Sequence, residues 1–403
     1  MTVCLVGLGK SDIAPELPHL TYRDVLFAAV TDALADAALD HTEIQAALTA
    51  SEDLVEGRSI ADEFTTDALA AKLKPNDRIC GDSLLAVLHA AMQIEAGVFD
   101  VVLVGGYEKS AEAQLDRLDA MAMDPFYDQP VCNVAEALAG MEWMRFRHET
   151  GLDRRIAALI AAKNHAAGAP YGEPVSVDQI LAGAPIVEGI TRFEKAVPAD
   201  GAVAIILASE EKAKEIAARH KTARPLLTLK SFSFAAETSW NGSRRYGAFP
   251  HLKSVATRVY RDAGITDPTG TLAFAELDDR YAHREAMAAL EFGLSDAARL
   301  ADDVAGGRFA ADGELAINPS GGRLGSGDLF TGAGTRALAE TGWLLRAGFG
   351  EEFAHDFSAG QTTWLATHED RRGRAAQALI STLFGPAATT GAAAVVAVDD
   401  LSA

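Results

Sequence analysis

The sequence predicts a doubly wound α/β protein with two similar halves. Apolar runs of the length of buried strands recur along the chain, for example at residues 99–106 and 393–398. Each half also contains a helix pattern that is largely apolar, at residues 84–96 and 335–345. A chain of 403 residues is longer than one ordinary compact domain, so two domains are expected.

The first half begins with a strand and a helix. Residues 3–9 form an apolar strand that ends in glycine, and residues 21–39 have apolar side chains at helical spacing. Residues 84–96 are apolar on nearly every face, which predicts a helix enclosed within the protein. The run at 99–106 then predicts a strand inside a parallel sheet.

The composition changes in the middle of the chain. Residues 113–185 are rich in Met, Asp and Arg and show helical stretches without a strong strand, which indicates a helical insertion over the sheet. Residues 201–207 return to a buried strand, and an exposed charged helix follows at 210–219. Pro225 is the expected boundary between the halves. The predicted domains are residues 1–224, with a helical loop domain inserted at about 113–195, and residues 225–403.

The second half repeats the pattern of the first. Residues 252–263 predict an amphipathic helix, and residues 272–277 predict a strand. A short strand at 315–318 runs into a glycine-rich segment, residues 319–334. An apolar helix and a final buried strand complete this half, which supports a duplicated architecture.

Composition and charge exclude several classes of partner. Hydrophobic residues make up 49% and charged residues 23% of the chain, as in globular proteins with a large core. The formal net charge of −21 disfavours nucleic acids and anionic membranes as partners. The N-terminus lacks the basic region of a signal peptide, and the most continuous apolar run, residues 84–94, is too short to span a bilayer. A cytoplasmic protein is therefore expected.

Four segments, taken in order, resemble one protein family. Residues 96–109 read AGVFDVVLVGGYEK, similar to the pattern AGxxDxVLxxGxEK, and residues 161–165 end in a KNH segment. Residues 198–204 (PADGAVA) are similar to a DGAAA turn, and residues 318–322 (NPSGG) are similar to the start of a second glycine-rich signature. Together these segments resemble thiolases, most closely the sterol-carrier-protein-type branch.

The resemblance extends over essentially the whole chain and implies a fold. That fold is the thiolase fold, a duplicated five-layer αβαβα arrangement with the helical loop domain inserted in the N-terminal half. The resemblance also implies a homodimer, in which the two copies pair through the edge strand of the N-terminal sheet.

Cys80 is the one cysteine in a position that favours reactivity. The chain also has Cys4, in an apolar strand, and Cys132, and no CxxC spacing that would indicate zinc or disulfides. Cys80 precedes Asp100 by twenty residues, as the nucleophile does in thiolases. The start of a helix stabilises a thiolate, whereas the neighbouring Asp82, which is also a possible helix cap, opposes it. An inert core cysteine is the alternative interpretation.

The segments expected to carry the family's other catalytic groups differ from the family pattern. Asp328 stands where the histidine of a GHP signature is expected, and Asp278 stands where the histidine of an HDxF motif is expected. Asp279 matches the aspartate of that motif, and residues 385–391 contain no cysteine. A carboxylate cannot donate a hydrogen bond to an oxyanion unless it is protonated, so ordinary thiolysis is not expected.

The thiolase fold would bring Asp278, Asp279 and Asp328 together near Cys80. One interpretation is an altered acid–base site, because clustered carboxylates raise one another's pKa. A second is a site for Mg²⁺ or Ca²⁺, and a third is a set of merely solvated side chains. For a coenzyme A thioester, Arg244 and Arg245 are the expected basic contacts, with a solvated loop as the alternative. The resemblance adds two glycines to the binding residues, Gly321 and Gly322.

Three functions remain open on this basis. The first is an acyltransferase-type enzyme, similar to acetyl-CoA acetyltransferases, with altered chemistry and Cys80 as nucleophile. The second is a carbon–carbon lyase similar to the retro-aldolases of this branch, which work with a small acyl-CoA-binding OB-fold partner. The third is a catalytically silent subunit that binds acyl-CoA or assembles a complex. A coenzyme A thioester is the expected substrate in lipid metabolism, with no metal or prosthetic group.

Overall fold

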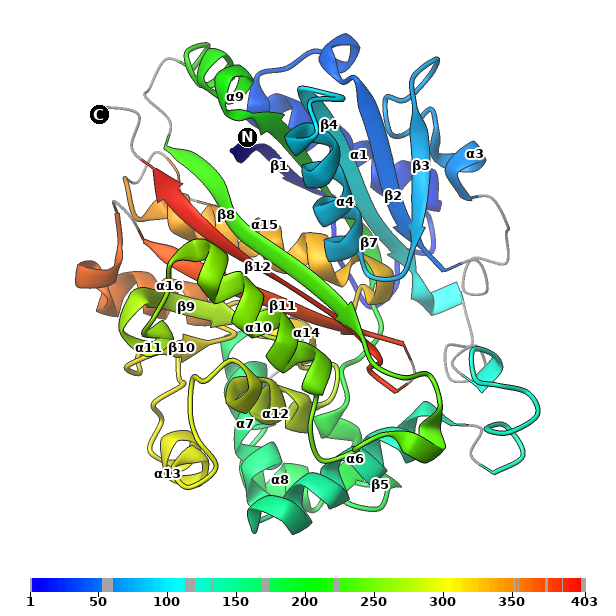
Figure 1. Cartoon of the computed structure of the whole chain (residues 1–403), viewed down its shortest axis with the longest axis vertical. Coiled ribbons are helices and arrows are strands. Elements are labelled where there is room, and N and C mark those ends of the chain that lie inside the picture. Colours follow the sequence, from blue (N-terminus) through cyan, green and yellow to red (C-terminus); the bar gives the residue numbers. More distant parts are fainter. Residues whose placement is uncertain are drawn as a thin grey trace.

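The computed structural model describes residues 2–52, 61–112, 120–131, 134–168, 174–220, 225–350, 353, 355–373, 376–385 and 387–399. Ten strands form one hydrogen-bonded sheet across the molecule (Figure 1). In spatial order they are β10 (Ala316–Ile317), β9 (Leu272–Glu276), β11 (Gln377–Phe384), β12 (Thr390–Asp399), β8 (Leu226–Ala236), β1 (Val3–Lys10), β7 (Asp200–Ser209), β4 (Val101–Lys109), β2 (Ala46–Ser51) and β3 (Asn76–Cys80). The N-terminal and C-terminal halves each supply five of them and meet where β1 pairs with β8 in antiparallel fashion.

Helices cover and separate the two halves of this sheet. On its outer surfaces, α1 (Tyr22–Ala37) and α9 (Glu210–Ala217) pack on the N-terminal strands, and α10 (Pro250–Ala263) packs on the C-terminal strands with α12 (Ala282–Glu291) beside it. Between the halves lie α4 (Ser83–Glu95) and α15 (Ala333–Ala347), which pack against each other and against strands of both halves. The predicted five-layer αβαβα thiolase architecture is therefore confirmed.

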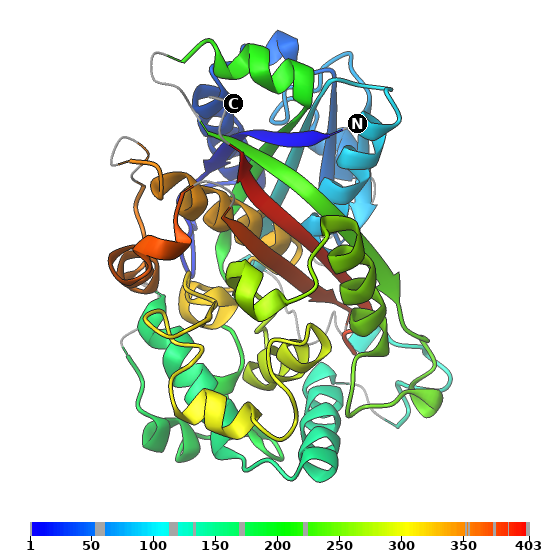
Figure 2. The ribbon, with the colours of Figure 1, turned by 60° about the vertical axis from the view of Figure 1, so that its left-hand side comes forward.

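The loop domain lies between β4 and β7 in the sequence. It contains α6 (Ala135–Thr150), α7 (Arg155–Ala167), α8 (Val177–Leu181) and the paired strands β5 (Pro185–Val187) and β6 (Ile190–Thr191). These helices gather at the end of the molecule opposite α1 and α9 (Figure 2). The remaining described α-helices are α3 (Ala61–Thr65), α11 (Pro268–Thr271), α13 (Leu300–Ala305), α14 (Gly322–Ser326) and α16 (Ala359–Thr367).

The glycine-rich segment at α14 packs closely on the loop domain. A Cβ atom at Gly325 would lie 2.0 Å from the backbone oxygen of Asn164 in α7, so a larger residue cannot occupy this position without movement of the backbone. At Gly321, where φ is +92°, a Cβ atom would lie 2.4 Å from the Cα of Gly168. This contact fixes the segment that carries several of the predicted site residues.

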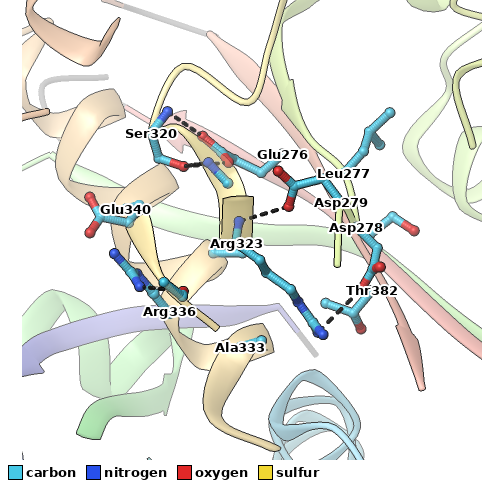
Figure 3. Close-up of a pocket in the computed structure, with 14 residues that line it drawn as sticks. Glu276, Leu277, Asp278, Asp279, Ser320, Arg323, Ala333, Arg336, Glu340 and Thr382 are labelled. Carbon is cyan, nitrogen blue, oxygen red and sulfur yellow. Dashed lines mark hydrogen bonds and ion pairs between the residues drawn. The ribbon is translucent and has the colours of Figure 1, made fainter. Parts of the chain in front are cut away.

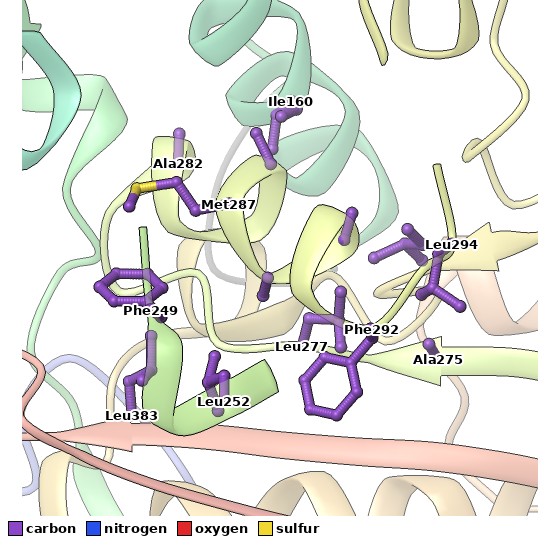
Figure 4. Close-up of a cluster of buried hydrophobic side chains, with 14 of the residues drawn as sticks. Ile160, Phe249, Leu252, Ala275, Leu277, Ala282, Met287, Phe292, Leu294 and Leu383 are labelled. Atoms are coloured by element: carbon purple, nitrogen blue, oxygen red, sulfur yellow. The ribbon is translucent and has the colours of Figure 1, made fainter. Parts of the chain in front are cut away.

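Buried apolar side chains hold the C-terminal helices on the sheet. Phe249 and Leu252, at the start of α10, pack with Met287 of α12 and with Phe292 just beyond it (Figure 4). Each of these side chains is almost fully buried, which stabilises the fold by about 1.5–3 kcal/mol per residue. Among the described residues, no helix has the length and apolar character needed to cross a bilayer.

Candidate active site

A buried arginine, Arg323 of α14, connects three aspartates. Its Nη2 atom lies 3.3 Å from Oδ2 of Asp82 and 3.2 Å from Oδ2 of Asp278, and its Nη1 atom lies 3.5 Å from Oδ1 of Asp328. Each of the four side chains is less than a tenth exposed. Figure 3 shows Arg323 extended toward Asp278 and Thr382. Charged groups at such depth are tolerated only when paired in this way.

Asp82 links the two halves of the protein. It is the N-cap of α4, where Oδ1 accepts a hydrogen bond from the backbone N–H of Leu84 at 2.8 Å. Of Asp82 and Ser83, the two residues available to cap this helix, the structure uses Asp82. The same oxygen accepts a bond from the hydroxyl of Thr382 in β11 at 2.9 Å. The N-terminus of α4 is thereby tied to a strand of the C-terminal half.

A second arginine, Arg280, extends the cluster. Its Nε lies 3.4 Å from Oδ2 of Asp328, and its guanidinium lies over the ring of Phe330, 4.9 Å from the ring centre. Asp278 also accepts a hydrogen bond from the backbone N–H of Leu383 at 3.2 Å. Asp82, Asp278, Asp328, Arg280 and Arg323, hereafter the aspartate–arginine cluster, therefore contain three carboxyl groups and two guanidinium groups.

Burial and the neighbouring charges shift the pKa values of Asp82 and Arg323. Burial raises the pKa of Asp82 to about 6, although Arg323 acts in the opposite direction. Burial alone would lower the pKa of Arg323, but Asp278, Asp328 and Asp82 outweigh it and raise that pKa. Arg323 is thus always charged, and Asp82 is a carboxyl group able to accept or release a proton near neutral pH.

Asp279 is not part of the ion-paired cluster but holds α14 in place. Its carboxylate accepts hydrogen bonds from the backbone N–H groups of Arg323 at 2.7 Å and Leu324 at 3.3 Å. The side-chain amide of Asn164 donates a third at 2.8 Å. Burial, together with the nearby Glu285, raises the pKa of Asp279 well above its usual range. The structure thus gives Asp279 a positioning role at the start of α14.

Glu276 is a further buried carboxyl group next to the cluster. It accepts hydrogen bonds from the backbone N–H of Ser320 at 3.0 Å and from its hydroxyl at 2.7 Å, and burial raises its pKa to about 7. Glu276, Asp278 and Arg323 line one cavity of about 30 Å³ (Figure 3). The hydroxyl of Ser381 in its wall has no hydrogen-bond partner among the described residues. This space suits about one water molecule.

Comparison with curated proteins finds relatives over most of the chain, although no family model matches it. The chain is 26% identical over 361 residues to an acetyl-CoA acetyltransferase of Methanocaldococcus jannaschii, covering 85% of this chain and 90% of the relative. It is 25% identical to sterol carrier protein 2 of Gallus gallus, covering 85% and 66%. It is 24% identical to a 17-hydroxy-3-oxo-4-pregnene-20-carboxyl-CoA lyase of Mycobacterium tuberculosis, covering 80% and 86%.

Solved structures match almost the entire fold. An Ltp2–ChsH2(DUF35) aldolase superposes with a TM-score of 0.78 at 18% identity, covering 99% of this chain and 98% of the other. Human mitochondrial 3-ketoacyl-CoA thiolase in complex with CoA superposes with a TM-score of 0.68 at 16% identity, covering 98% of both. The chain therefore has the thiolase fold. Its distant sequence relatives include sterol carrier protein 2 and the mycobacterial lyase, and the Ltp2–ChsH2(DUF35) aldolase shares its fold.

Cys80 lies outside the ion-paired cluster. It is the last residue of β3 and is exposed, and its thiol donates a hydrogen bond to Oε2 of Glu52 at 3.5 Å. Cys4 is buried in β1, and Cys132 lies outside the described residues. The structure therefore brings Asp278 and Asp328 to Arg323, with Asp279 on the adjoining turn, and it places the Cys80 thiol at the surface.

We expect iodoacetamide to alkylate Cys80 in the folded protein at neutral pH and to leave Cys4 unmodified. The reason is accessibility, since Cys80 is exposed and Cys4 is fully buried. Peptide mass mapping after a short exposure measures both sites, and a parallel sample with coenzyme A tests whether a ligand covers Cys80. Equal labelling of the two cysteines would contradict this expectation.

The residues expected to bind coenzyme A lie in unlike surroundings. Arg245 is exposed and pairs with Glu149 at 3.1 Å, whereas the side chain of Arg244 is buried. Gly321 and Gly322 both have positive φ, and a Cβ atom at Gly322 would lie 2.3 Å from Oδ2 of Asp279. The two glycines are therefore required for the packing of the turn, and the arginines do not form one exposed basic patch.

Sequence reasoning did not identify the two arginines of the cluster. Arg323 is a single basic residue in a glycine-rich segment, whereas Arg280 lies in a charged stretch after two aspartates, and an arginine is usually exposed. The available signal was their sequence position, directly beside Asp279 and within five residues of Asp328 respectively. Carboxylates that are buried together require nearby cations, and the sequence positions of Arg280 and Arg323 made them candidates for this role.

Proposed function

We propose that this chain is the thiolase-like subunit of a carbon–carbon lyase that cleaves β-hydroxyacyl-CoA thioesters by a retro-aldol reaction. The observation that carries the proposal is the aspartate–arginine cluster at the N-terminus of α4. It offers carboxyl groups as proton carriers and guanidinium groups as oxyanion donors, in a buried environment that strengthens both effects.

The chemistry of a retro-aldol cleavage suits these groups. A base takes the proton of the β-hydroxyl group, the Cα–Cβ bond breaks, and its electron pair forms the enolate of the thioester. The β-carbon leaves as a ketone or an aldehyde, and protonation of the enolate carbon gives the shortened acyl-CoA. We assign Asp82, whose pKa is about 6, as the base and Arg323 as the donor to the enolate oxygen. No oxidant and no thiol are consumed.

The comparisons favour a lyase with a partner. The aldolase structure gives a TM-score of 0.78, against 0.68 for the thiolase with CoA. Because that aldolase contains ChsH2(DUF35), we propose that this chain also works with a small OB-fold protein that binds acyl-CoA. We further propose a homodimer formed through β3, whose outer edge ends the described sheet.

Acyl transfer through Cys80 is the second candidate function. It is favoured by the position of this accessible thiol, three residues before the first helical residue of α4 and close to the positive end of the helix dipole. In this alternative, Cys80 takes the acyl group from one thioester and passes it to another acceptor. The two functions differ in whether the thiol is needed, and this difference makes them separable by mutation.

Two variants separate the candidates. With the partner protein present, β-hydroxyacyl-CoA cleavage is followed by the released carbonyl product, and thiolysis is followed with acetoacetyl-CoA. We expect Cys80→Ser to retain cleavage and Asp82→Asn to lose about 10²–10⁴-fold, because Asn keeps the helix cap but not the base. Asp302→Asn, an exposed change in α13, is the matched control.

The other outcomes of this experiment would favour a different function. Loss of acyl transfer in Cys80→Ser, with no cleavage in the wild type, would favour the acyltransferase. If the wild type turns over neither substrate with its partner, the lyase proposal fails. The small size of the cavity beside Arg323 would then favour a silent acyl-CoA-binding subunit.

A further inference from the structure

Glu276, the last residue of β9, is a buried carboxyl group that the proposed reaction does not yet use. Its two oxygens accept hydrogen bonds from the backbone and the hydroxyl of Ser320, and no described residue forms an ion pair with it. A buried carboxylate without a counterion is costly, so burial favours the protonated form. Burial raises the pKa of Glu276 to about 7, and the nearby Glu340 acts in the same direction.

The carboxyl group of Glu276 borders a space of the size of one water molecule. Glu276, Arg323 and Glu340 of α15 line the cavity of about 30 Å³ described above (Figure 3). The hydroxyl of Ser381 in its wall is almost fully buried and has no hydrogen-bond partner in the part of the chain that the structure describes. A buried water requires two to four polar partners, and these side chains supply them. The cavity therefore suits a water within reach of both Glu276 and Arg323.

A second, larger cavity connects this space with the surface. Its volume is about 370 Å³, and it reaches solvent, because the exposed residues Asp12 and Asp356 are part of its wall. Glu340 is only partly buried, and its Oε2 accepts a hydrogen bond from the amide of Gln361 in the wall of this larger cavity at 2.9 Å. Three residues line both cavities: Ser320, Arg336 and Glu340.

The cations near Glu276 are occupied elsewhere. Lys163 of α7 lowers the pKa of Glu276, but its Nζ lies 3.1 Å from Oε1 of Glu285. Arg323 pairs with the aspartates of the cluster, and Arg336 donates to backbone oxygens beside α14. An arginine does not release its proton in proteins, so Glu340 is the carboxyl group through which a proton can pass from one cavity to the other.

We infer that Glu276 protonates the enolate carbon through a water in the cavity beside Arg323, and that Glu340 returns the proton to Glu276 from solvent. The inference rests on the proposed lyase function and assigns the proton donor that completes it. Asp82 is in contact with Arg323 but does not line this cavity, so the base and the proton donor are different groups.

The proton transfers of the reaction balance with these two groups. Asp82 takes the proton of the β-hydroxyl group and releases it to solvent. Glu276 gives its proton to the cavity water, which passes one to the enolate carbon, and Glu340 then restores the proton on Glu276. The pKa of Asp82 is about 6 and that of Glu276 about 7, so near neutral pH Asp82 is the more ionised and suits the base, and Glu276 suits the acid.

Hydrogen exchange at the α-carbon of propionyl-CoA tests this assignment. The full chain and its partner are incubated with propionyl-CoA in heavy water, and NMR follows the loss of the α-proton signal. We expect exchange by the wild type and a loss of at least about 10²-fold in Glu276→Gln, because glutamine keeps the bonds to Ser320 but carries no transferable proton. Glu340→Gln should show a smaller loss, and Glu211→Gln, at an exposed position in α9, should exchange like the wild type.

A second readout separates proton transfer from a merely structural role. Glu276→Gln should release the carbonyl product of a β-hydroxyacyl-CoA in one rapid burst equal to the enzyme concentration, because cleavage of the carbon–carbon bond does not require Glu276. Turnover after the burst should be slow, because the enolate is then protonated slowly. A burst reduced in the same proportion as turnover would indicate a structural role and contradict the inference.

The outcomes distinguish this inference from the proposed function. Exchange at the wild-type rate in Glu276→Gln would overturn the inference and leave the lyase proposal standing. Exchange that depends on Glu276, in a protein that cleaves no β-hydroxyacyl-CoA, would support the proton transfer and count against the lyase. An absence of exchange in the wild type would overturn the inference, and the cleavage assay alone would then decide the lyase proposal.

Discussion

Replacing Arg323 by methionine is expected to lower the free energy of unfolding by about 3–5 kcal/mol, because it leaves buried carboxylates without their shared counterion. Asp82, Asp278 and Asp328 would then repel one another at depth, and the pKa of Asp82, which Arg323 lowers and Asp278 raises, would rise further. A carboxyl group with a raised folded-state pKa stabilises the fold while it is protonated and loses this effect as pH rises. The loss of unfolding free energy caused by Arg323→Met should therefore be larger at about pH 8 than at about pH 5.

Urea unfolding at the two pH values measures this effect. Arg336→Met is the matched control, because Arg336 lines the same cavity but donates to the backbone oxygens of Ser326 and Gly327. We expect a smaller loss in this control and little change of that loss with pH. A loss in Arg323→Met that does not depend on pH would contradict the assignment of Arg323 as counterion to the three aspartates.

The wild-type protein should lose stability as pH rises through the range of 6 to 7. The pKa of Asp82 is raised to about 6 and that of Glu276 to about 7 in the folded state, against about 4 for unfolded carboxyl groups. Stability from their protonation is complete below about pH 4 and is lost as pH passes the folded values. The expected loss is on the order of a few kcal/mol.

Glu276→Gln isolates one part of this dependence. Glutamine is neutral at every pH and can still bond with the N–H and hydroxyl of Ser320, so the variant should show a flatter profile near pH 7. Denaturant unfolding at several values between about pH 5 and 8 measures the profile. Glu63→Gln, in α3 at the surface, should reproduce the wild-type curve. An unchanged profile in Glu276→Gln would show that Glu276 is not the group responsible.

The elements with strong apolar patterns were predictable, and those without one were not. The helix predicted at 84–96 is α4 (Ser83–Glu95), and the strand predicted at 201–207 lies within β7 (Asp200–Ser209). In contrast, β3 reads NDRIC and β8 alternates between buried and partly exposed residues. The edge strand β3 has no fully buried face and therefore little periodic signal, whereas β8 lies between β12 and β1 and is paired on both sides. In both strands, pairing within the sheet decides the structure.

The candidate site was predictable in its acidic members only. The family pattern singled out Asp278 and Asp328, and the fold does bring them together. The family pattern could not show that Arg323 lies between Asp278 and Asp328, because burial of an arginine depends on contacts between residues far apart in the sequence. Arg244 illustrates the same limit, since its position in a polar loop predicted exposure and its side chain is buried.

The origin of the cluster in two halves of the chain has a consequence for folding cooperativity. Asp82 comes from the N-terminal half, whereas Arg323 and the hydroxyl of Thr382 come from the C-terminal half. If one half unfolded alone, Asp82 would lose its ion pair with Arg323, and the antiparallel pairing between β1 and β8 would be lost. Partly unfolded states that separate the halves are thereby penalised, so the two halves should behave as one cooperative unit, which the apolar core that they share also favours.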